Sequence, residues 1–194
     1  MIKSIAVYCG SSFGADTIYR QAAVGLGKVL AERGITLVYG GANVGLMGAV
    51  ADGALQQGGK VIGVLPRFLQ RKELAHEHLT ELHLVETMHE RKLMMNDLCD
   101  GVIALPGGFG TMEELFEMLT WGQLGLHQKP IALYNMQGFY DELLLLLRRM
   151  SEEGFLREDN RSMLLVGASP EEILENMSRY SPPDVAKWIS RNTA

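Results

Sequence analysis

Short apolar runs that suit β-strands alternate with longer stretches of helical spacing along most of the chain. The runs are SIAVYCG, ITLVYGG, KVIGVLP, LHLVE, GVIALPGG and KPIALYN. They are almost continuously apolar, which is typical of strands that are covered on both faces. The alternation therefore predicts an α/β fold: a Rossmann-like, doubly wound, mostly parallel sheet with helices on both faces.

The stretches between these runs predict the helices. They cover residues 17–33, 44–57, 89–99, 111–124, 139–153 and 170–178. No repeat or linker divides the 194 residues, of which 47% are hydrophobic, so one core is expected. We expect a single domain over residues 1–180, followed by a C-terminal tail or short helix over residues 181–194.

The charge balance points to a small-molecule partner. The net charge is -5, which gives no general attraction to nucleic acid or to an anionic membrane.

Cys9 and Cys99 stand outside any metal or disulfide pattern and are expected to be buried thiols. Without a signal-peptide pattern or a membrane-length apolar run, the sequence predicts a cytoplasmic protein.

Three of the predicted strands end in glycine-rich or serine-containing loops, YCGSS, VYGGANVGLMG and ALPGGFGT. Since the carboxyl ends of parallel strands share one edge of a sheet, the loops predict a common ligand crevice there. They lack the fingerprints of ATP and dinucleotide sites, which favours a nucleoside monophosphate. Ser12 and the loop of residues 40–48 either close this crevice or only form tight turns.

The segment LPGGFGTMEELFEM places Thr111 and Glu114 at a T-x-x-E spacing. That spacing fits a capping box, in which both side chains satisfy backbone donors, but it also fits a phosphate loop followed by a working carboxylate. ETMHERKLMMN places Arg91 and Lys92 in the first turns of a helix, where cations oppose the helix dipole. They either face an anion or form an exposed turn paired with acidic neighbours.

MHERK and PGGFGTMEE resemble the paired signatures of the Lonely guy (LOG) family. The likeness continues through GGANVGLMG, KELAH and TWGQLGLHQKPIALYN, over nearly all of the first 160 residues. It implies a phosphoribohydrolase, or AMP nucleosidase, that hydrolyses the N-glycosidic bond of AMP or cytokinin riboside 5'-monophosphates to an adenine-type base and ribose 5-phosphate. Family members are often labelled lysine decarboxylase, but no pyridoxal-phosphate lysine motif is evident here.

The resemblance places the catalytic pair on Arg91 and Glu114. It places substrate contacts on Glu73, Arg91, Lys92, Gly108, Phe109, Gly110, Thr111, Met112, Glu113, Glu114 and Thr120. Glycosidic cleavage passes through an oxocarbenium-like sugar, so Glu114 could stabilise positive charge or take a proton from water. Arginine cannot act as an ordinary proton donor, so Arg91 is expected to hold substrate oxygens and to stabilise charge. Lys92 is expected to be a secondary anion contact.

The phosphate is expected to lie on the backbone N–H groups of Gly108, Gly110 and Thr111, where glycine permits close approach and positive φ. Glu113 is expected to face solvent or to pair with a neighbour of the substrate-binding residues. We expect no cofactor and no metal. The histidine-rich segment lacks a clear ligand pair and fits surface or core positions better; it comprises His76, His78, His83 and His89.

Two rival functions remain open. A binding protein of the same fold would need Thr111 and Glu114 only as a cap, whereas a phosphotransferase would need a magnesium and triphosphate apparatus that the motifs lack. The helices around MEELFEMLTWGQLGL and RKLMMNDLCDG are apolar over more than one narrow stripe. This pattern predicts burial by a second subunit as well as by the sheet, and hence a homodimer.

Overall fold

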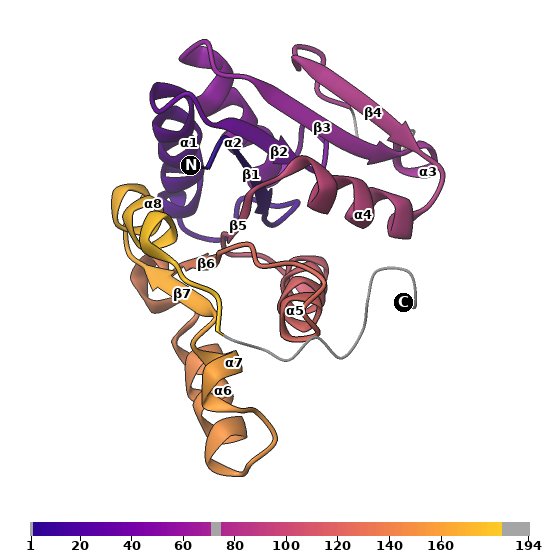
Figure 1. Cartoon of the computed structure of the whole chain (residues 1–194). Helices are drawn as coiled ribbons and strands as arrows, with labels where there is room; N and C mark the ends of the chain where they lie inside the picture. The colour runs from indigo at the N-terminus through magenta and orange to yellow at the C-terminus, as the bar shows by residue number, and fades with distance from the viewer. Residues whose placement is uncertain (1, 71–74, 184–194) are drawn as a thin grey trace.

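The computed structural model describes residues 2–70 and 75–183 and contains one seven-stranded sheet (Figure 1). Its order is β4-β3-β2-β1-β5-β6-β7, and all six strand pairings are parallel. The strands are β1 (Ser4–Tyr8), β2 (Thr36–Tyr39), β3 (Val61–Pro66), β4 (Glu81–Val85), β5 (Gly101–Ala104), β6 (Ile131–Tyr134) and β7 (Leu164–Gly167). The predicted fold class is confirmed. The sequence analysis did not predict β7.

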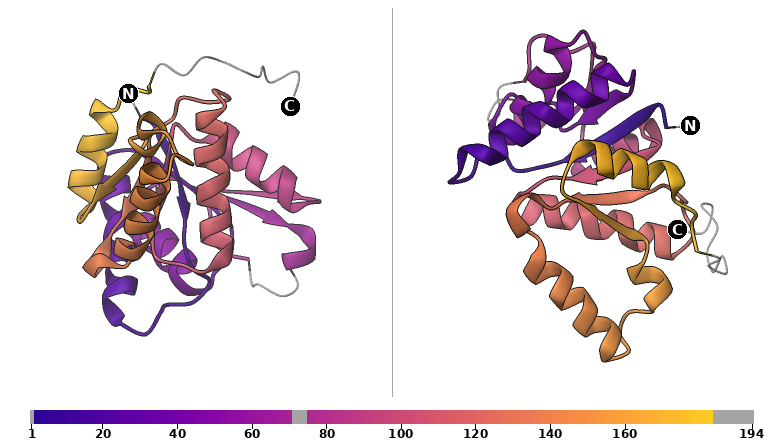
Figure 2. Two further views of the ribbon diagram at one scale, coloured as in Figure 1. Left: turned by 90° about the horizontal axis from the view of Figure 1, so that it is seen from below. Right: turned by 90° about the vertical axis from the view of Figure 1, so that its left-hand side faces the viewer.

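Helices cover both faces of the sheet (Figure 2). They are α1 (Thr17–Glu32), α2 (Gly45–Gln56), α3 (Arg67–Gln70), α4 (Met88–Leu98), α5 (Phe109–Gln123), α6 (Asp141–Glu152), α7 (Glu158–Arg161) and α8 (Pro170–Arg179), with a 3-10 turn η1 (Met136–Gly138). Every helix expected from the sequence is present, with its ends at most two residues from the prediction. The short helices α3 and α7 were not expected.

The core consists of two apolar layers, one on each side of the sheet. Helices α1, α2 and α8 cover one face, and α4 and α5 cover the other. Helices α1 and α2 pack closely because two glycines leave room at their contact. A methyl group at Gly27 would overlap the carbonyl oxygen of Val50, and one at Gly53 would overlap that of Val24. Helices α6 and α7 project away from the body of the molecule (Figure 1).

The strand order reverses at β1, because β2, β3 and β4 extend to one side and β5, β6 and β7 to the other. At this point the Gly10 N–H donates to the Pro106 carbonyl (3.1 Å) and the Leu105 N–H donates to the Tyr8 carbonyl (2.9 Å). The loops that follow β1 and β5 are thus fixed side by side. In open α/β sheets, a ligand crevice forms at such a switch point.

Two predicted features fall outside the described residues. Glu73 lies in the gap between residues 70 and 75, and most of the predicted tail lies beyond residue 183. Within the described part of the chain, no helix combines the length and apolarity that a membrane crossing requires.

Candidate active site

Helix α5 begins earlier than the sequence suggested, and this changes the role of two residues. Its N-cap is Gly108, and the first helical hydrogen bond runs from the Met112 N–H to the Gly108 carbonyl (3.1 Å). Thr111 and Glu114 are therefore the third and sixth residues of the helix. The capping-box interpretation is wrong, because a capping box would require Thr111 to precede the first turn. Glu114 has no capping duty.

The start of α5 is suited to bind an anion. The first N–H groups of a helix have no partner within the helix and lie at the positive end of its dipole. Gly108 has φ of -96°, and neither Gly108 nor Gly110 has the positive φ expected from the sequence, because both follow ordinary helix-start geometry. Instead, methyl groups at these two positions would meet no atom within 4 Å. The glycines leave room for a ligand.

Helix α4 is fixed at its start by two hydrogen bonds from backbone N–H groups to side chains. Thr87, the N-cap, accepts from the Glu90 N–H (3.1 Å), while the Glu90 carboxylate accepts from the Glu86 N–H (2.9 Å). This start turns Arg91 toward the sheet. Its side chain is 10% exposed, as is that of Glu114, and Nη1 of Arg91 lies 3.7 Å from Oε1 of Glu114. The alternative of an exposed basic turn is wrong for Arg91.

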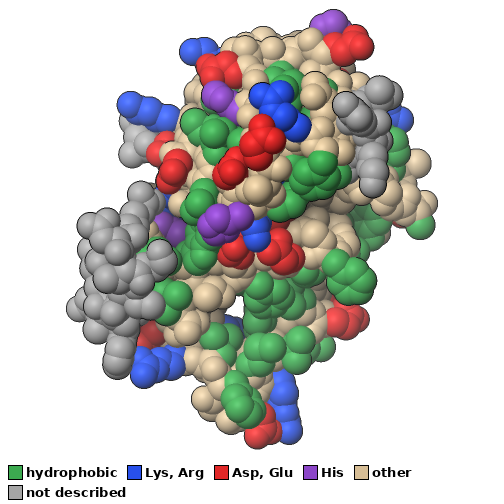
Figure 3. All heavy atoms as spheres, turned by 90° about the vertical axis from the view of Figure 1, so that its right-hand side faces the viewer, with side chains coloured by type: hydrophobic (Ala, Val, Ile, Leu, Met, Phe, Trp, Pro, Cys, Tyr) green, Lys and Arg blue, Asp and Glu red, His purple; other side chains and the backbone are tan. Residues whose placement is uncertain are grey.

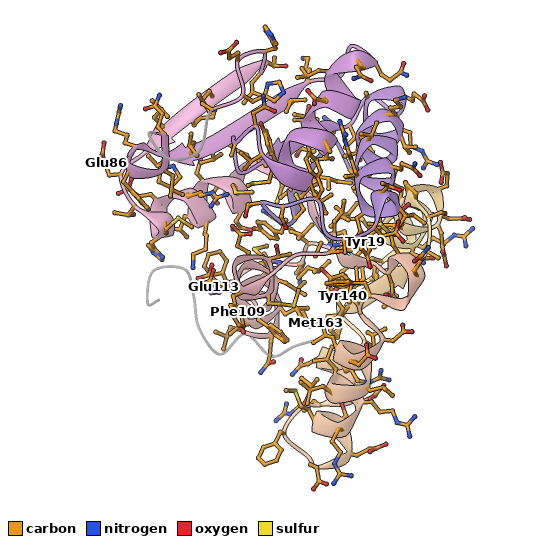
Figure 4. The ribbon with its side chains drawn as sticks, turned by 180° about the vertical axis from the view of Figure 1, so that it is seen from behind. Tyr19, Glu86, Phe109, Glu113, Tyr140 and Met163 are labelled. Carbon is orange, nitrogen blue, oxygen red and sulfur yellow. The ribbon has the colours of Figure 1, made fainter. Side chains whose placement is uncertain are left out.

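The pair faces a cavity of about 270 Å³ at the carboxyl ends of the strands. Three loops contribute to its wall, after β1, after β2 and before α5, so the predicted common crevice is confirmed. Its lining residues are Val7, Tyr8, Cys9, Gly10, Ser11, Gly40, Met47, Met88, Arg91, Met95, Gly108, Phe109, Gly110, Thr111, Glu113 and Glu114. Phe109 and Glu113 mark the α5 side of this cavity (Figure 4).

Burial changes the acid chemistry of the cavity. It raises the pKa of Glu114 to about 7, although the Arg91 guanidinium acts in the opposite direction. Glu114 therefore changes charge near neutral pH, which suits a group that exchanges protons with a substrate or a water molecule. Burial also raises the pKa of Cys9, so this thiol stays protonated. Cys9 and Cys99 are both buried and free, as expected.

Lys92 points to the acidic side chains of α5. Its Nζ lies 2.6 Å from Glu113 and 3.0 Å from Glu117. Burial lowers the pKa of Lys92, but the hydrogen bonds to these two carboxylates outweigh it and raise the pKa overall. Glu113, whose side chain is 56% exposed, faces solvent as one of the two expectations had it, and it pairs with Lys92. Lys92 joins α4 to α5 directly behind the Arg91–Glu114 pair.

Three expected substrate contacts that the structure describes, Lys92, Met112 and Thr120, do not line the cavity. Met112 packs against the apolar layer, and the exposed Thr120 donates its hydroxyl to the Phe116 carbonyl (2.7 Å). Glu73 lies outside the described residues. Ser12 lines a neighbouring cavity with Phe13, and Ser11 takes its place in the main cavity.

Sequence reasoning missed the methionines of the cavity wall. Met88 and Met95 lie three residues before and four residues after Arg91, so helical spacing puts all three side chains on one face of α4. That spacing was a usable signal. Met47 comes from α2, and only the tertiary fold brings it there.

Two of the histidines in residues 76–89 contact acidic side chains. The Nε2 atom of buried His76 lies 3.0 Å from Asp52, its Nδ1 accepts from the His78 N–H (3.2 Å), and His83 contacts Glu81. Across residues 2–70 and 75–183, no three His, Cys, Asp or Glu side chains form a group that could hold a metal ion.

Known proteins match both the chain and its fold. A sequence family described as "Possible lysine decarboxylase" matches residues 47–177. Cytokinin riboside 5'-monophosphate phosphoribohydrolase LOG of Oryza sativa subsp. japonica is 46% identical over 180 residues, covering 93% of this chain and 74% of that protein. The corresponding LOG2 protein of Arabidopsis thaliana is 42% identical, covering 98% and 91%.

Among solved structures, a molybdenum cofactor binding protein from Rippkaea orientalis has a TM-score of 0.68 at 24% identity, over 92% of this chain and 96% of that one. The molybdenum cofactor carrier protein of Chlamydomonas reinhardtii has a TM-score of 0.69 at 20% identity, over 92% and 97%. At these identities the likeness concerns the fold alone.

Fold and site together define a doubly wound α/β protein with a buried arginine–glutamate pair at its switch point. The sequence matches are more specific: the chain belongs to the LOG family, the family that is also described as possible lysine decarboxylases. Pyridoxal phosphate needs a lysine for its Schiff base, and none of the described lining residues is a lysine.

Proposed function

We propose that this protein is a nucleoside 5'-monophosphate phosphoribohydrolase that acts on AMP or on cytokinin riboside 5'-monophosphates. The products are a free adenine-type base and ribose 5-phosphate. The observation that carries the proposal is the buried Arg91–Glu114 pair, 3.7 Å apart, beside the open start of α5. The names of the plant relatives support the class of substrate.

The 5'-phosphate binds at the start of α5 in this proposal. The backbone N–H groups of Phe109, Gly110 and Thr111 belong to the first turn, and the open space at Gly108 and Gly110 admits phosphate oxygens close to the backbone. Arg91 supplies the compensating charge. Its Nε atom is buried and has no hydrogen-bond partner among the described residues, so the guanidinium retains donors for substrate oxygens.

Glu114 lies one turn further along α5 and acts at the ribose. The bond between C1' and the base nitrogen breaks, and its electron pair leaves with the base, which takes up a proton from solvent. A water oxygen then bonds to C1' and its proton passes to the Glu114 carboxylate. The ionised carboxylate also stabilises the positive charge that develops on the sugar.

The first test is the requirement for phosphate. If remote binding energy positions the sugar, AMP should be hydrolysed with a kcat/KM at least roughly 10²-fold above that of adenosine. Release of free base is measured for AMP, isopentenyladenosine monophosphate, GMP, CMP and adenosine. Equal values for AMP and adenosine would remove the phosphate assignment. Binding of AMP without release of adenine from any nucleotide would favour the rival binding protein.

We also propose a homodimer. Phe109 on α5 is 96% exposed, and Leu93 on α4 is 40% exposed; both helices also carry residues of the site. On the face shown in Figure 3, hydrophobic side chains gather in the lower half of the molecule. Burying such surface requires a partner. Light scattering at micromolar concentration should give twice the chain mass of 21.4 kDa, and a monomer mass would contradict the dimer.

A further inference from the structure

The glycines that follow β2 are required for different reasons. Gly41 and Gly45 have φ of 77° and 54°, which disfavours any residue with a side chain. Gly40 has no such conformation, so its backbone would accept an L-amino acid without strain. What Gly40 provides is space, and the question is which group uses it.

The Arg91 guanidinium uses this space. A methyl group at Gly40 would overlap Nη2 of Arg91, and it would lie 3.3 Å from Cζ of Arg91 and 3.0 Å from Sδ of Met47. All of these atoms are at the ends of long side chains, and none belongs to the backbone. The overlap would therefore be relieved by displacing the guanidinium, while the fold stays in place.

Few polar contacts hold the guanidinium where it is. Nη1 lies 3.7 Å from Glu114 and 3.9 Å from Sδ of Met88, and Nε has no hydrogen-bond partner among the described residues. None of these contacts is a short, directional hydrogen bond. The position of the guanidinium thus depends on the packing surface beneath it, to which Gly40 contributes.

We propose that Gly40 is a positioning residue: because it has no side chain, it leaves the space in which the Arg91 guanidinium lies beside Glu114. The proposal rests on the proposed function, because it takes Arg91 to act on the substrate. Displacements of about 1 Å can lower catalysis by 10²-fold. Gly40→Ala is therefore expected to lower kcat/KM for AMP by roughly tenfold to a hundredfold while folding normally.

The test is a double-mutant cycle of Gly40→Ala and Arg91→Ala. In the presence of Arg91, Gly40→Ala should lower kcat/KM by at least about tenfold. In the Arg91→Ala background the same change should lower kcat/KM by less than about twofold, because the guanidinium that it displaces is absent. An equal loss in both backgrounds would overturn the proposal, as would no loss in either.

A matched control separates positioning from packing. A methyl group at Gly27 would overlap the carbonyl oxygen of Val50, which is backbone, and Gly27 lies between α1 and α2. Gly27→Ala should therefore lower the melting temperature yet leave the activity of the folded protein unchanged. Gly40→Ala should lower the activity and leave the melting temperature nearly unchanged. A large loss of thermal stability in Gly40→Ala would return Gly40 to a structural role.

One readout is independent of turnover. The side-chain ¹⁵N–¹H resonance of Arg91 Nε can be assigned by its absence in Arg91→Ala, and it should shift in Gly40→Ala but not in Gly27→Ala. If no nucleotide is hydrolysed and this shift is seen, the proposed function fails while the positioning role of Gly40 is supported. If hydrolysis occurs and the resonance is unchanged, the proposed function is supported and the positioning role of Gly40 fails.

Discussion

Glu114 illustrates at the residue scale how burial creates a reactive carboxylate. An exposed glutamate is fully ionised at neutral pH, but Glu114 is buried and its pKa is raised to about 7. Arg91 lowers this pKa, so the guanidinium keeps an ionised fraction available. The pair therefore combines a proton acceptor and a fixed positive charge in a single small cavity.

Replacing Glu114 by Gln separates catalysis from binding. Gln keeps the shape but has neither the charge nor the basicity, so kcat should fall by roughly 10²-fold or more. AMP affinity should persist because the phosphate site is mostly backbone. The measurements are adenine release, AMP titration and a thermal melt. Near-normal turnover in a folded Glu114→Gln protein would exclude a catalytic role.

At the scale of elements, α4 and α5 are joined by three ion pairs made by two adjacent basic residues of α4. Arg91 meets Glu114, and Lys92 meets Glu113 and Glu117. The Lys92 side chain is 13% exposed, so its ion pairs are less screened than those at the surface. Lys92 therefore links α4, which carries Arg91, to α5, which carries Glu114.

Lys92→Ala should consequently be milder than Arg91→Ala. We expect about 1 kcal/mol of lost stability, or a melting temperature lower by about 2–4 °C, with weaker AMP binding and a modest loss of turnover. Arg91→Ala should lose most of its turnover. Both variants are compared in the same adenine-release assay. If Lys92→Ala loses as much turnover as Arg91→Ala, Lys92 acts on the reaction directly.

The sequence was informative about elements and less so about helix starts. Continuous apolarity identified six strands, and helical spacing located α1, α2, α4, α5, α6 and α8 within two residues. The start of α5 was misplaced because Thr111 and Glu114 match a capping pattern locally. The true cap, Gly108, has no side chain to signal it.

The site was predictable where motifs contained it. Arg91 and Glu114 were brought together as expected, whereas Met47 and the function of Gly40 depend on long-range packing. A loop glycine looks the same in the sequence whether it adopts a positive φ, as Gly41 does, or leaves space for a distant side chain. Only the folded chain distinguishes these cases.

At the scale of the whole molecule, the buried Glu114 carboxylate affects the stability of the fold. The pKa of Glu114 is raised from 4.5 to about 7 on folding, mainly by burial, so the native state holds a proton that the unfolded chain releases. This contribution is fully present below about pH 4.5 and is lost as the pH rises through about 7. Its size is on the order of 3 kcal/mol.

The wild-type protein should therefore melt several degrees lower at about pH 8 than at about pH 5.5. The decisive quantity is the difference from Glu114→Gln, which keeps every other titratable group but has no proton to lose at position 114. Its melting temperature should depend less on pH over the same interval. Thermal melts of both proteins at matched ionic strength measure this difference. Identical pH dependence in the two would mean that Glu114 is ionised in the native state throughout, and its proposed proton exchange near neutral pH would have to be abandoned.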